Sequence, residues 1–244
     1  MLTAYDYPTA KVLDEAGVDI ILVGDSCGMV VMGRSDTLGV TMDQMVHHTR
    51  MVADAVDNAL VVADMPFMSY QVSTEEAVRN AGRFVAEAGA QAVKLEGPAD
   101  KFGEAIAAIL RAGIPVVGHI GLTPQSVNQI GGYKVQGRSE EARIRLKQEA
   151  QGLEDVGCFC LVLECIPGDL AAEITAALSI PTIGIGAGAQ CDGQVLVVHD
   201  MLGWGKTRFT KTYADVRGLM RQACVDYVAE VKSGAFPAKE HEYQ

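Results

Sequence analysis

The sequence is poor in aromatic residues and in positive charge. Aromatic residues make up 6% of its 244 residues, with a single Trp. Lys and Arg number 20 against 31 Asp and Glu, which gives a formal net charge of −11. This charge repels phosphate backbones and anionic lipid surfaces, and no cluster of Lys and Arg makes a local exception. We therefore expect neither a nucleic-acid partner nor a membrane partner.

Long apolar runs and targeting signals are also missing from the sequence. The longest apolar runs, such as Ile20–Val23 and residues 195–198, have the length of strands and are far too short to cross a bilayer. The first residues, MLTAYDYP, contain neither the basic region nor the apolar core of an export signal. We expect a cytoplasmic protein.

The cysteines form no recognisable motif. There are six, with no C-x-x-C pair among them. Cys158 and Cys160 are two residues apart and would share one face of a strand. We expect reduced, mostly buried thiols rather than disulfides or a zinc site.

Short apolar runs alternate with longer amphipathic segments along the whole chain, which is the pattern of repeated βα units. The expected strands lie at 2–6, 19–25, 60–66, 92–97, 115–121, 159–165, 181–188 and 195–200. The expected helices lie at 9–16, 41–58, 74–88, 99–112, 139–156, 169–178 and 213–232. The connection between the last two runs is too short for a helix. With no linker in sight, the pattern predicts an α/β fold, a (βα)8 TIM barrel that forms a single domain over residues 1–244.

One connection is unusually long. Residues 122–138, LTPQSVNQIGGYKVQGR, are rich in glycine and polar residues. Loops of this length commonly act as lids or binding loops, and in a barrel the loops that follow strands form the active-site face. We expect segment 122–138 to be a lid.

Several apolar runs end in polar or charged residues. In a parallel barrel these ends meet at one mouth, where unpaired buried charges would be costly unless they bind a ligand or a metal. The pattern therefore predicts a catalytic site. The candidate residues are Asp25, Ser26, Asp64, Lys94, Glu96, His119 and Glu164.

The three acidic residues Asp25, Asp64 and Glu96 offer the hard oxygen ligands that Mg2+ prefers. Lys94 and Glu96 are two residues apart on one strand, so their side chains share a face. The lysine can pair with these carboxylates or with an acidic substrate. A magnesium site next to an anionic substrate is the resulting hypothesis.

Each residue also has a simpler interpretation. A single Asp after a strand is often the N-cap of the next helix, and a single His is often a structural hydrogen-bonding residue. Glu164 fits such a role less well, because a carboxylate between Leu163 and Cys165 is costly without a use. The glycines of 184–189, GIGAGA, match a loose dinucleotide pattern, but no helix follows at once, so we expect no nucleotide site.

Motifs along the whole chain resemble one family, ketopantoate hydroxymethyltransferase. They are TAYDYPTA, LVGDSCGMVVMG, ADMPFMSY, VKLEG, GHIGLTPQSVNQIGGYKVQGR, LVLECIP and CDGQVLVVHDMLG. The resemblance implies a barrel of the phosphoenolpyruvate/pyruvate type and a homo-oligomer, commonly a decamer. It also implies Mg2+-dependent transfer of a hydroxymethyl group, through an enolate, from 5,10-methylenetetrahydrofolate to the α-keto acid α-ketoisovalerate (3-methyl-2-oxobutanoate), in pantothenate synthesis.

The same resemblance implies roles for the candidate residues. Asp25 and Asp64 are similar to metal ligands that also face the substrate, and Glu96 to a third acidic group that reaches the metal directly or through water. Ser26, Lys94 and His119 resemble substrate contacts. Glu164 resembles the catalytic base.

The sequence differs from the usual pattern of this family at two places, and two other functions were considered. Family members usually carry a short helical segment before TAYDYP, so we expect either a shortened start or a different assembly. Cys27 stands where Leu is more common, and we expect an inert buried thiol.

A Mg2+-dependent lyase of the isocitrate lyase type would carry a reactive cysteine where this chain has GHIGLTPQ. A non-catalytic keto-acid-binding barrel would not need the intact polar set.

Overall fold

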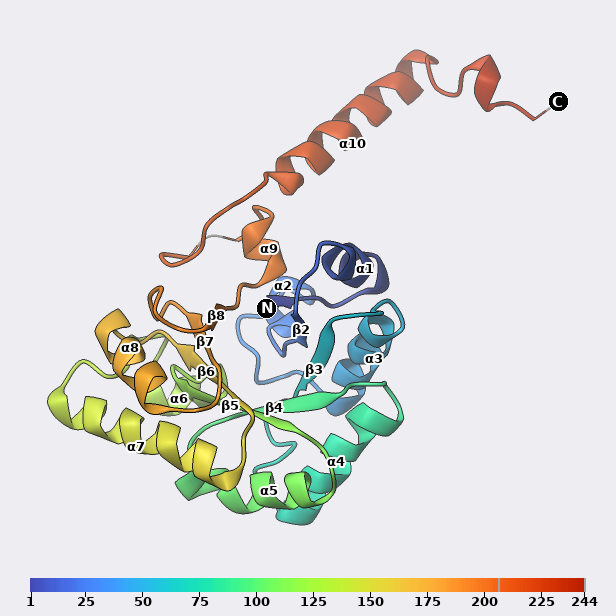
Figure 1. Cartoon of the computed structure of the whole chain (residues 1–244). Coiled ribbons are helices and arrows are strands. Elements are labelled where there is room, and N and C mark those ends of the chain that lie inside the picture. The colour runs from blue at the N-terminus through green and yellow to red at the C-terminus, as the bar shows by residue number, and fades with distance from the viewer. Residues whose placement is uncertain (206, 244) are drawn as a thin grey trace. The chain divides into compact units, whose positions relative to one another are not determined.

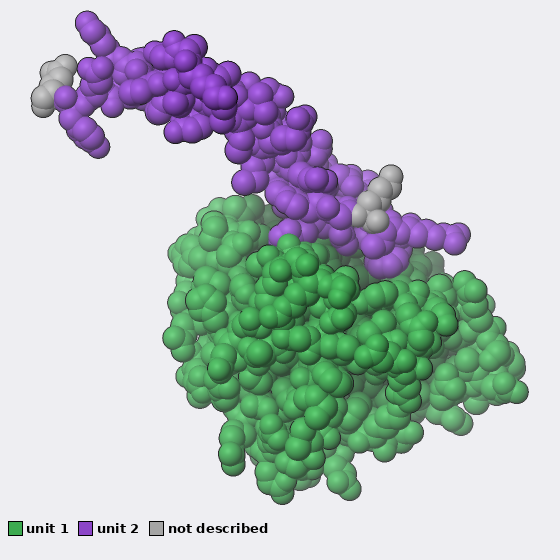
Figure 2. Space-filling view, turned by 180° about the vertical axis from the view of Figure 1, so that it is seen from behind, with its two compact units in different colours: residues 1–197 green, residues 198–244 purple. Residues whose placement is uncertain are grey.

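The computed structural model describes residues 1–205 and 207–243, and the chain divides into two compact units, residues 1–197 and 198–244 (Figure 2). The first unit contains every strand of the sheet described below. Whether the whole chain acts as one catalytic domain stays a prediction.

Eight parallel strands form a single curled sheet in chain order (Figure 1). Leu2 pairs with Leu196 in an isolated parallel bridge, and the Thr3 backbone N donates to Leu196 O at 3.1 Å. The expected α/β fold is confirmed, with an arrangement consistent with a TIM-like barrel. The strands are β1 (Leu2–Thr3), β2 (Ile20–Val23), β3 (Leu60–Asp64), β4 (Ala92–Glu96), β5 (Val116–Gly121), β6 (Cys160–Glu164), β7 (Thr182–Ile185) and β8 (Gly193–Gln194).

The long helices of the first unit lie along the outside of the sheet (Figure 1). Side chains at the start of several of them accept a backbone N–H of the first turn, as N-cap residues do: Asp6, Thr41, Ser73 and Ser139. The helices of this unit are α1 (Tyr7–Glu15), α2 (Cys27–Val30), α3 (Met42–Ala53), α4 (Thr74–Ala86), α5 (Ala99–Arg111), η1 (Pro124–Ser126), α6 (Val127–Ile130), α7 (Glu140–Val156) and α8 (Gly168–Ala177).

The expected helix at 41–58 was too long at its C-terminal end. α3 ends at Ala53, and the backbone N–H groups of Asp57 and Asn58 donate to the Asp14 carboxylate at 3.1 and 3.0 Å. These residues have therefore left the helix and close the turn into β3.

The prediction of the eighth strand was also displaced. β8 is Gly193–Gln194, only Leu196 of the expected run 195–200 forms a bridge, and Val198 already begins a helix. A short apolar run is compatible with either element. The residues that pair with β7 are Gly193 and Gln194, which precede this run. The expectation that no helix links β7 to β8 is confirmed for residues 186–192, all of which are described.

The inner face of the sheet is an apolar cluster with members from β2 to β7. Because successive strand residues face opposite sides, only alternate residues contribute. The cluster consists of Leu22, Val62, Ala92, Val117, Cys160, Val162, Ile183 and Val195.

The second unit consists of helices and connecting segments. It contains α9 (Val198–Met201), α10 (Val216–Ser233) and η2 (Lys239–His241). The Asp215 side chain accepts the Gly218 N–H at 2.9 Å and begins α10, close to the expected helix at 213–232. Over the described ranges, the chain has no helix that is both long and apolar enough to cross a membrane.

All six cysteines are free thiols, and five are buried, as predicted. Cys27 is completely buried, with its Sγ 3.6 Å from Met45 Sδ. Burial raises the pKa of the Cys27 thiol to about 12, and the charges of Asp25 and Asp64 add to the rise. A thiol of this kind stays protonated and unreactive at neutral pH.

Candidate active site

The candidate residues lie at the carboxyl ends of neighbouring strands. Asp64 is paired in register with Lys94, and Glu96 with His119. Asp64, Lys94, His119 and Glu164 each follow a member of the inner apolar cluster by two residues, so strand alternation directs them to the inner face as well. The inner face thus carries a polar layer directly above an apolar one.

Three carboxylates converge at this layer. Counted over the whole residue, Asp25, Asp64 and Glu96 each expose 3% of their surface. One oxygen from each residue can be chosen such that all three lie within 4.8 Å of one another. Asp25 lies just beyond β2, where its backbone N donates to Asp64 Oδ2 at 3.3 Å. The structure brings together the three residues that the sequence singled out for a metal.

Lys94 and His119 place cationic groups against this acidic cluster. Lys94 Nζ lies 2.8 Å from Asp64 Oδ1, 3.8 Å from Glu96 Oε1 and 3.2 Å from His119 Nδ1. His119 Nδ1 lies 3.6 Å from Glu96 Oε1, and its Nε2 lies 3.2 Å from Glu164 Oε2. One connected set of charges therefore runs from the acidic cluster to the predicted base.

The pKa shifts of the three carboxylates differ in direction. Burial raises the pKa of Asp25 well above its ordinary value, and the charges of Asp64 and Glu96 add to this. Burial also raises the pKa of Asp64, although Lys94 opposes it. For Glu96 the burial effect is outweighed by His119 and Lys94, which lower its pKa. Glu96 is thus the carboxylate most readily ionised.

Nearby carboxylates favour the charged forms of Lys94 and His119. Burial lowers the pKa of Lys94, but the carboxylates, Asp64 foremost, outweigh it and raise the pKa above its ordinary value. Burial and the Lys94 charge lower the pKa of His119, but Glu164 and Glu96 outweigh both and raise it to about 9. Lys94 is therefore charged at neutral pH, and Glu164 and Glu96 favour the charged form of His119.

The acidic cluster fits a small, hard divalent cation. Asp64 Oδ1 is buried and has no hydrogen-bond partner among the described residues, although the Lys94 ammonium is close enough to form an ion pair. Carboxylate oxygens are the ligands that Mg2+ prefers, and it commonly needs only a few of them. Asp25, Asp64 and Glu96 could hold such an ion.

Glu164 differs from the acidic cluster in its exposure. Its side chain is 16% exposed, against 2% for Glu96 and 4% for Asp64. It ends β6, and its backbone O accepts the Leu122 N–H at 2.8 Å. A partly open carboxylate beside a closed charged cluster is accessible to a substrate, as a general base has to be.

Ser26 lies beside a residue that the sequence reasoning missed. Its Oγ is 2.8 Å from the hydroxyl of Tyr5, and Tyr5 is 2% exposed. Burial raises the pKa of Tyr5, so its hydroxyl stays neutral. Only the TAYDYP motif could have pointed to Tyr5 as a site residue, because no spacing rule connects Tyr5 to Ser26.

Two more residues of the site had not been identified from the sequence. Gln125 is 5% exposed and contacts Asp25 and Glu96, and Tyr70 is 2% exposed and contacts Glu96 and Gln125. Both stand in connections rather than strands, where no periodicity points to a buried position.

Segment 122–138 is attached near the site at both ends. It contains η1 and α6, and near its other end the Gln136 N–H donates to Cys165 O at 2.9 Å. The Tyr133 hydroxyl lies 3.9 Å from Met29 Sδ of α2. The segment thus extends beside the strand ends, and its action as a lid stays a prediction.

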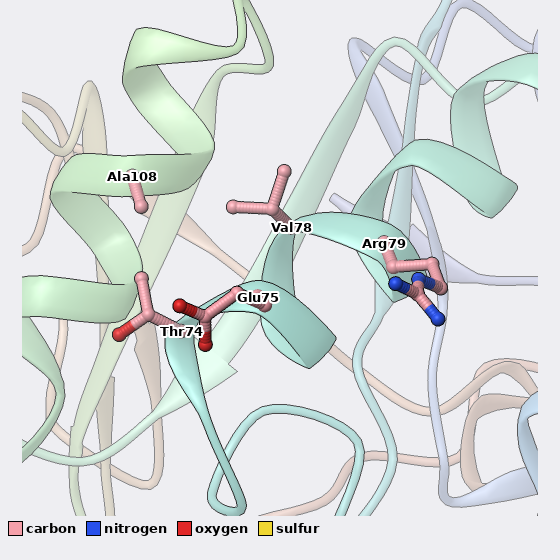
Figure 3. Close-up of a pocket in the computed structure, with 5 residues that line it drawn as sticks. All are labelled: Thr74, Glu75, Val78, Arg79 and Ala108. Atoms are coloured by element: carbon pink, nitrogen blue, oxygen red, sulfur yellow. The ribbon is translucent and has the colours of Figure 1, made fainter.

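A separate pocket lies between α4 and α5 (Figure 3). Its lining residues come from these two helices, and none is a candidate site residue. The strand-end cluster is therefore the better candidate for chemistry. The lining consists of Thr74, Glu75, Val78, Arg79 and Ala108.

Comparison with known proteins gives the family. The profile described as ketopantoate hydroxymethyltransferase matches residues 1–239. The chain belongs to the ketopantoate hydroxymethyltransferase family. The 3-methyl-2-oxobutanoate hydroxymethyltransferase of Clostridium novyi is 58% identical, over 99% of this chain and 88% of that protein. The enzyme of that name from Syntrophus aciditrophicus is 57% identical, over 100% of this chain and 90% of that protein.

Solved structures support the fold of this ketopantoate hydroxymethyltransferase family member. The phosphoenolpyruvate phosphomutase of Streptomyces platensis subsp. rosaceus aligns with a TM-score of 0.64, over 100% of this chain and 86% of that chain. At 16% identity the likeness concerns the fold alone.

Proposed function

We propose that this protein transfers a hydroxymethyl group from 5,10-methylenetetrahydrofolate to 3-methyl-2-oxobutanoate and so forms ketopantoate. The observation that carries the proposal is the connected polar layer: three buried carboxylates, Lys94 and His119, with the more exposed Glu164 at its edge. The high identity to enzymes named for this activity supports the same conclusion.

The residues have distinct roles in the proposed reaction. Mg2+ held by Asp25, Asp64 and Glu96 would stabilise negative charge on the substrate oxygens. Lys94 and His119 supply positive charge for the anionic keto acid, and the hydroxyl of Ser26 can donate to its carboxylate. Asp25 and Asp64 face the substrate as well.

Glu164 acts as the base. It removes the proton from the carbon next to the keto group, and His119 orients it through the 3.2 Å contact. One water molecule supplies the hydroxyl oxygen: it releases the one-carbon unit from the folate as formaldehyde and leaves tetrahydrofolate. The enolate attacks this carbon, and the new alkoxide takes up a proton to become the hydroxymethyl group. Segment 122–138 excludes bulk water while this happens.

The wider architecture belongs to the same proposal. The sheet is a complete (βα)8 barrel, supported by the Leu2–Leu196 bridge, and residues 1–244 act as one catalytic domain. By analogy with the family, the protein is a cytoplasmic homo-oligomer. Its partners are the small-molecule keto acid and the folate.

The rival functions are disfavoured. A lyase of the isocitrate lyase type does not fit a chain whose family is that of the hydroxymethyltransferases. A non-catalytic keto-acid-binding barrel would have no use for a partly exposed Glu164 held against His119.

An assay of the purified protein tests the proposal. With 3-methyl-2-oxobutanoate, 5,10-methylenetetrahydrofolate and Mg2+, we expect ketopantoate to form, and chelation of the metal to stop it. In deuterated water without folate, NMR should show Mg2+-dependent exchange of the substrate proton next to the keto group. Cleavage of a carbon–carbon bond without transfer would instead identify a lyase, and binding without exchange would identify a non-catalytic barrel.

A further inference from the structure

Gln125 makes direct contact with two of the three clustered carboxylates. Its side-chain Nε2 donates to Asp25 Oδ2 at 3.0 Å and to Met65 O at 2.9 Å. Its backbone N donates to Glu96 Oε2 at 3.0 Å. One residue of η1 therefore holds one oxygen of each of two predicted metal ligands.

The carboxamide of Gln125 is itself fixed from the opposite side. Its Oε1 accepts the Tyr70 hydroxyl at 2.8 Å and Gln71 Nε2 at 3.2 Å. The Tyr70 hydroxyl in turn accepts the Glu96 N–H at 3.2 Å. Turning the amide over would place Oε1 against the Asp25 carboxylate and a carbonyl oxygen, so the surroundings select one orientation.

A neutral donor suits this position. Asp25 Oδ2 and Glu96 Oε2 accept N–H groups of Gln125, so a cation would approach the other oxygen of each carboxylate. In Glu96 that oxygen, Oε1, also faces Lys94 at 3.8 Å and His119 at 3.6 Å. A lysine or arginine here would also satisfy the carboxylates, but its charge would oppose binding of a cation. An amide orients the ligands without that repulsion.

We propose that Gln125 is a positioning residue for the metal site: it orients Asp25 and Glu96 and couples their geometry to segment 122–138, to which it belongs. This inference rests on the proposed function, because it assumes that the acidic cluster binds Mg2+. Groups that orient metal ligands in this way typically contribute about 10- to 100-fold to metal affinity.

Calorimetric titration with Mg2+ tests the proposal on the full chain. In Gln125→Met the side chain keeps a similar shape but loses its donor to Asp25, while the backbone N–H to Glu96 remains. We expect Mg2+ affinity to fall about 10- to 100-fold. The matched control is Gln151→Met: Gln151 Nε2 also donates to two carboxylates, Glu154 and Asp155, both at 2.9 Å, but on the exposed surface of α7. The control should bind Mg2+ like the wild type.

Further measurements separate positioning from a merely structural role. At saturating Mg2+ the kcat of Gln125→Met should approach that of the wild type, because the defect lies in metal affinity. Mg2+ should slow amide hydrogen exchange in 122–138 of the wild type and do so less in the variant. If Gln125→Met does not fold, Tyr70→Phe provides the test. It removes the hydroxyl that donates to Gln125 Oε1 and accepts the Glu96 N–H, and loss of the bond to Gln125 should by itself lower Mg2+ affinity about fivefold.

The possible results have clear meanings. Wild-type Mg2+ affinity in a folded Gln125→Met, or in Tyr70→Phe where that variant replaces it, overturns the positioning role and leaves the proposed function intact. A wild-type protein that binds no Mg2+ overturns both. A lower melting temperature with unchanged Mg2+ affinity identifies a structural role only, and contradicts the inference.

Discussion

His119 Nε2 lies 3.2 Å from Glu164 Oε2, so the predicted base is held by an imidazole that also faces the acidic cluster. This contact joins the exposed edge of the site to its closed interior. The protonated form of His119 would pair with the Glu164 carboxylate, next to the place where the substrate would lose a proton. The two residues are therefore expected to act as a pair.

Glu164→Gln should abolish proton removal without abolishing binding. The amide keeps the shape of the side chain but cannot accept a proton, and general bases typically contribute about 10²- to 10⁴-fold. We expect exchange of the keto-acid proton in deuterated water to fall by that factor while Mg2+ affinity stays unchanged. Glu173→Gln, in an exposed ion pair with Arg143, is the control. Exchange at the wild-type rate would exclude Glu164 as the base.

Asp64→Asn should strongly destabilise the metal-free protein. The change leaves the Lys94 ammonium without its closest carboxylate in a nearly dry site, and breaking such a pair typically costs about 3–5 kcal/mol. The free energy of unfolding, measured with urea, reports this loss. Mg2+ binding should be lost as well.

The control for Asp64→Asn is Asp57→Asn. Asp57 pairs with Lys11 at 2.7 Å, about the same distance as the Lys94–Asp64 pair, but its side chain is 73% exposed. Exposed pairs contribute about 0–1 kcal/mol. Equal losses in the two variants would show that burial of the Lys94 pair has no energetic consequence.

Gly121→Ala should damage the site through the backbone. Gly121 has a φ of 95°, and an added Cβ would lie 2.2 Å from Glu164 O. Gly113 has a similar φ of 84°, but nothing lies within 4 Å of its added Cβ. Gly113→Ala thus measures strain alone, about 1–3 kcal/mol. Gly121→Ala should lower the free energy of unfolding further and reduce activity, and equal effects on both measures would argue against a tight fit at Glu164.

The pKa of His119 gives a prediction for pH dependence. It is raised from its ordinary 6.5 to about 9, with Glu164 as a main stabiliser of the charged form. In the metal-free protein the stabilisation by this charge is therefore complete below about pH 6.5 and is lost as the pH rises through about 9. NMR titration of the ring nitrogens should show the raised value, and Glu164→Gln should lower it. An unchanged pKa in that variant would mean that the contact is not formed in solution.

The strand-end residues could be predicted because two simple rules act together. Apolar runs that end in Asp64, Glu96 or Glu164 identify strand ends, and parallel strands bring those ends to one mouth. Alternation along the strand then explains why Lys94 and His119 join them on the inner face. Local composition and general topology were sufficient for this part.

Gln125, Tyr70 and Tyr5 could not be predicted in the same way. They stand outside regular strands, and their positions depend on how the connections fold over the strand ends rather than on a period in the sequence. The eighth strand was misplaced for a related reason, because β8 is defined by the pairing of Gly193 and Gln194 with β7 and not by the apolar run that follows them. Three-dimensional context, not local pattern, determines these features.

The polar layer also affects which sheet the chain can form. A slip of one residue between neighbouring strands would turn Lys94, His119 and Glu164 toward the apolar inner surfaces of the surrounding helices, and would separate the partners in the Asp64–Lys94 and Glu96–His119 pairs. Each misaligned sheet would bury several unpaired charges. The charges that make the site reactive therefore also exclude misregistered folds, so selection for activity would preserve the alignment of the strands.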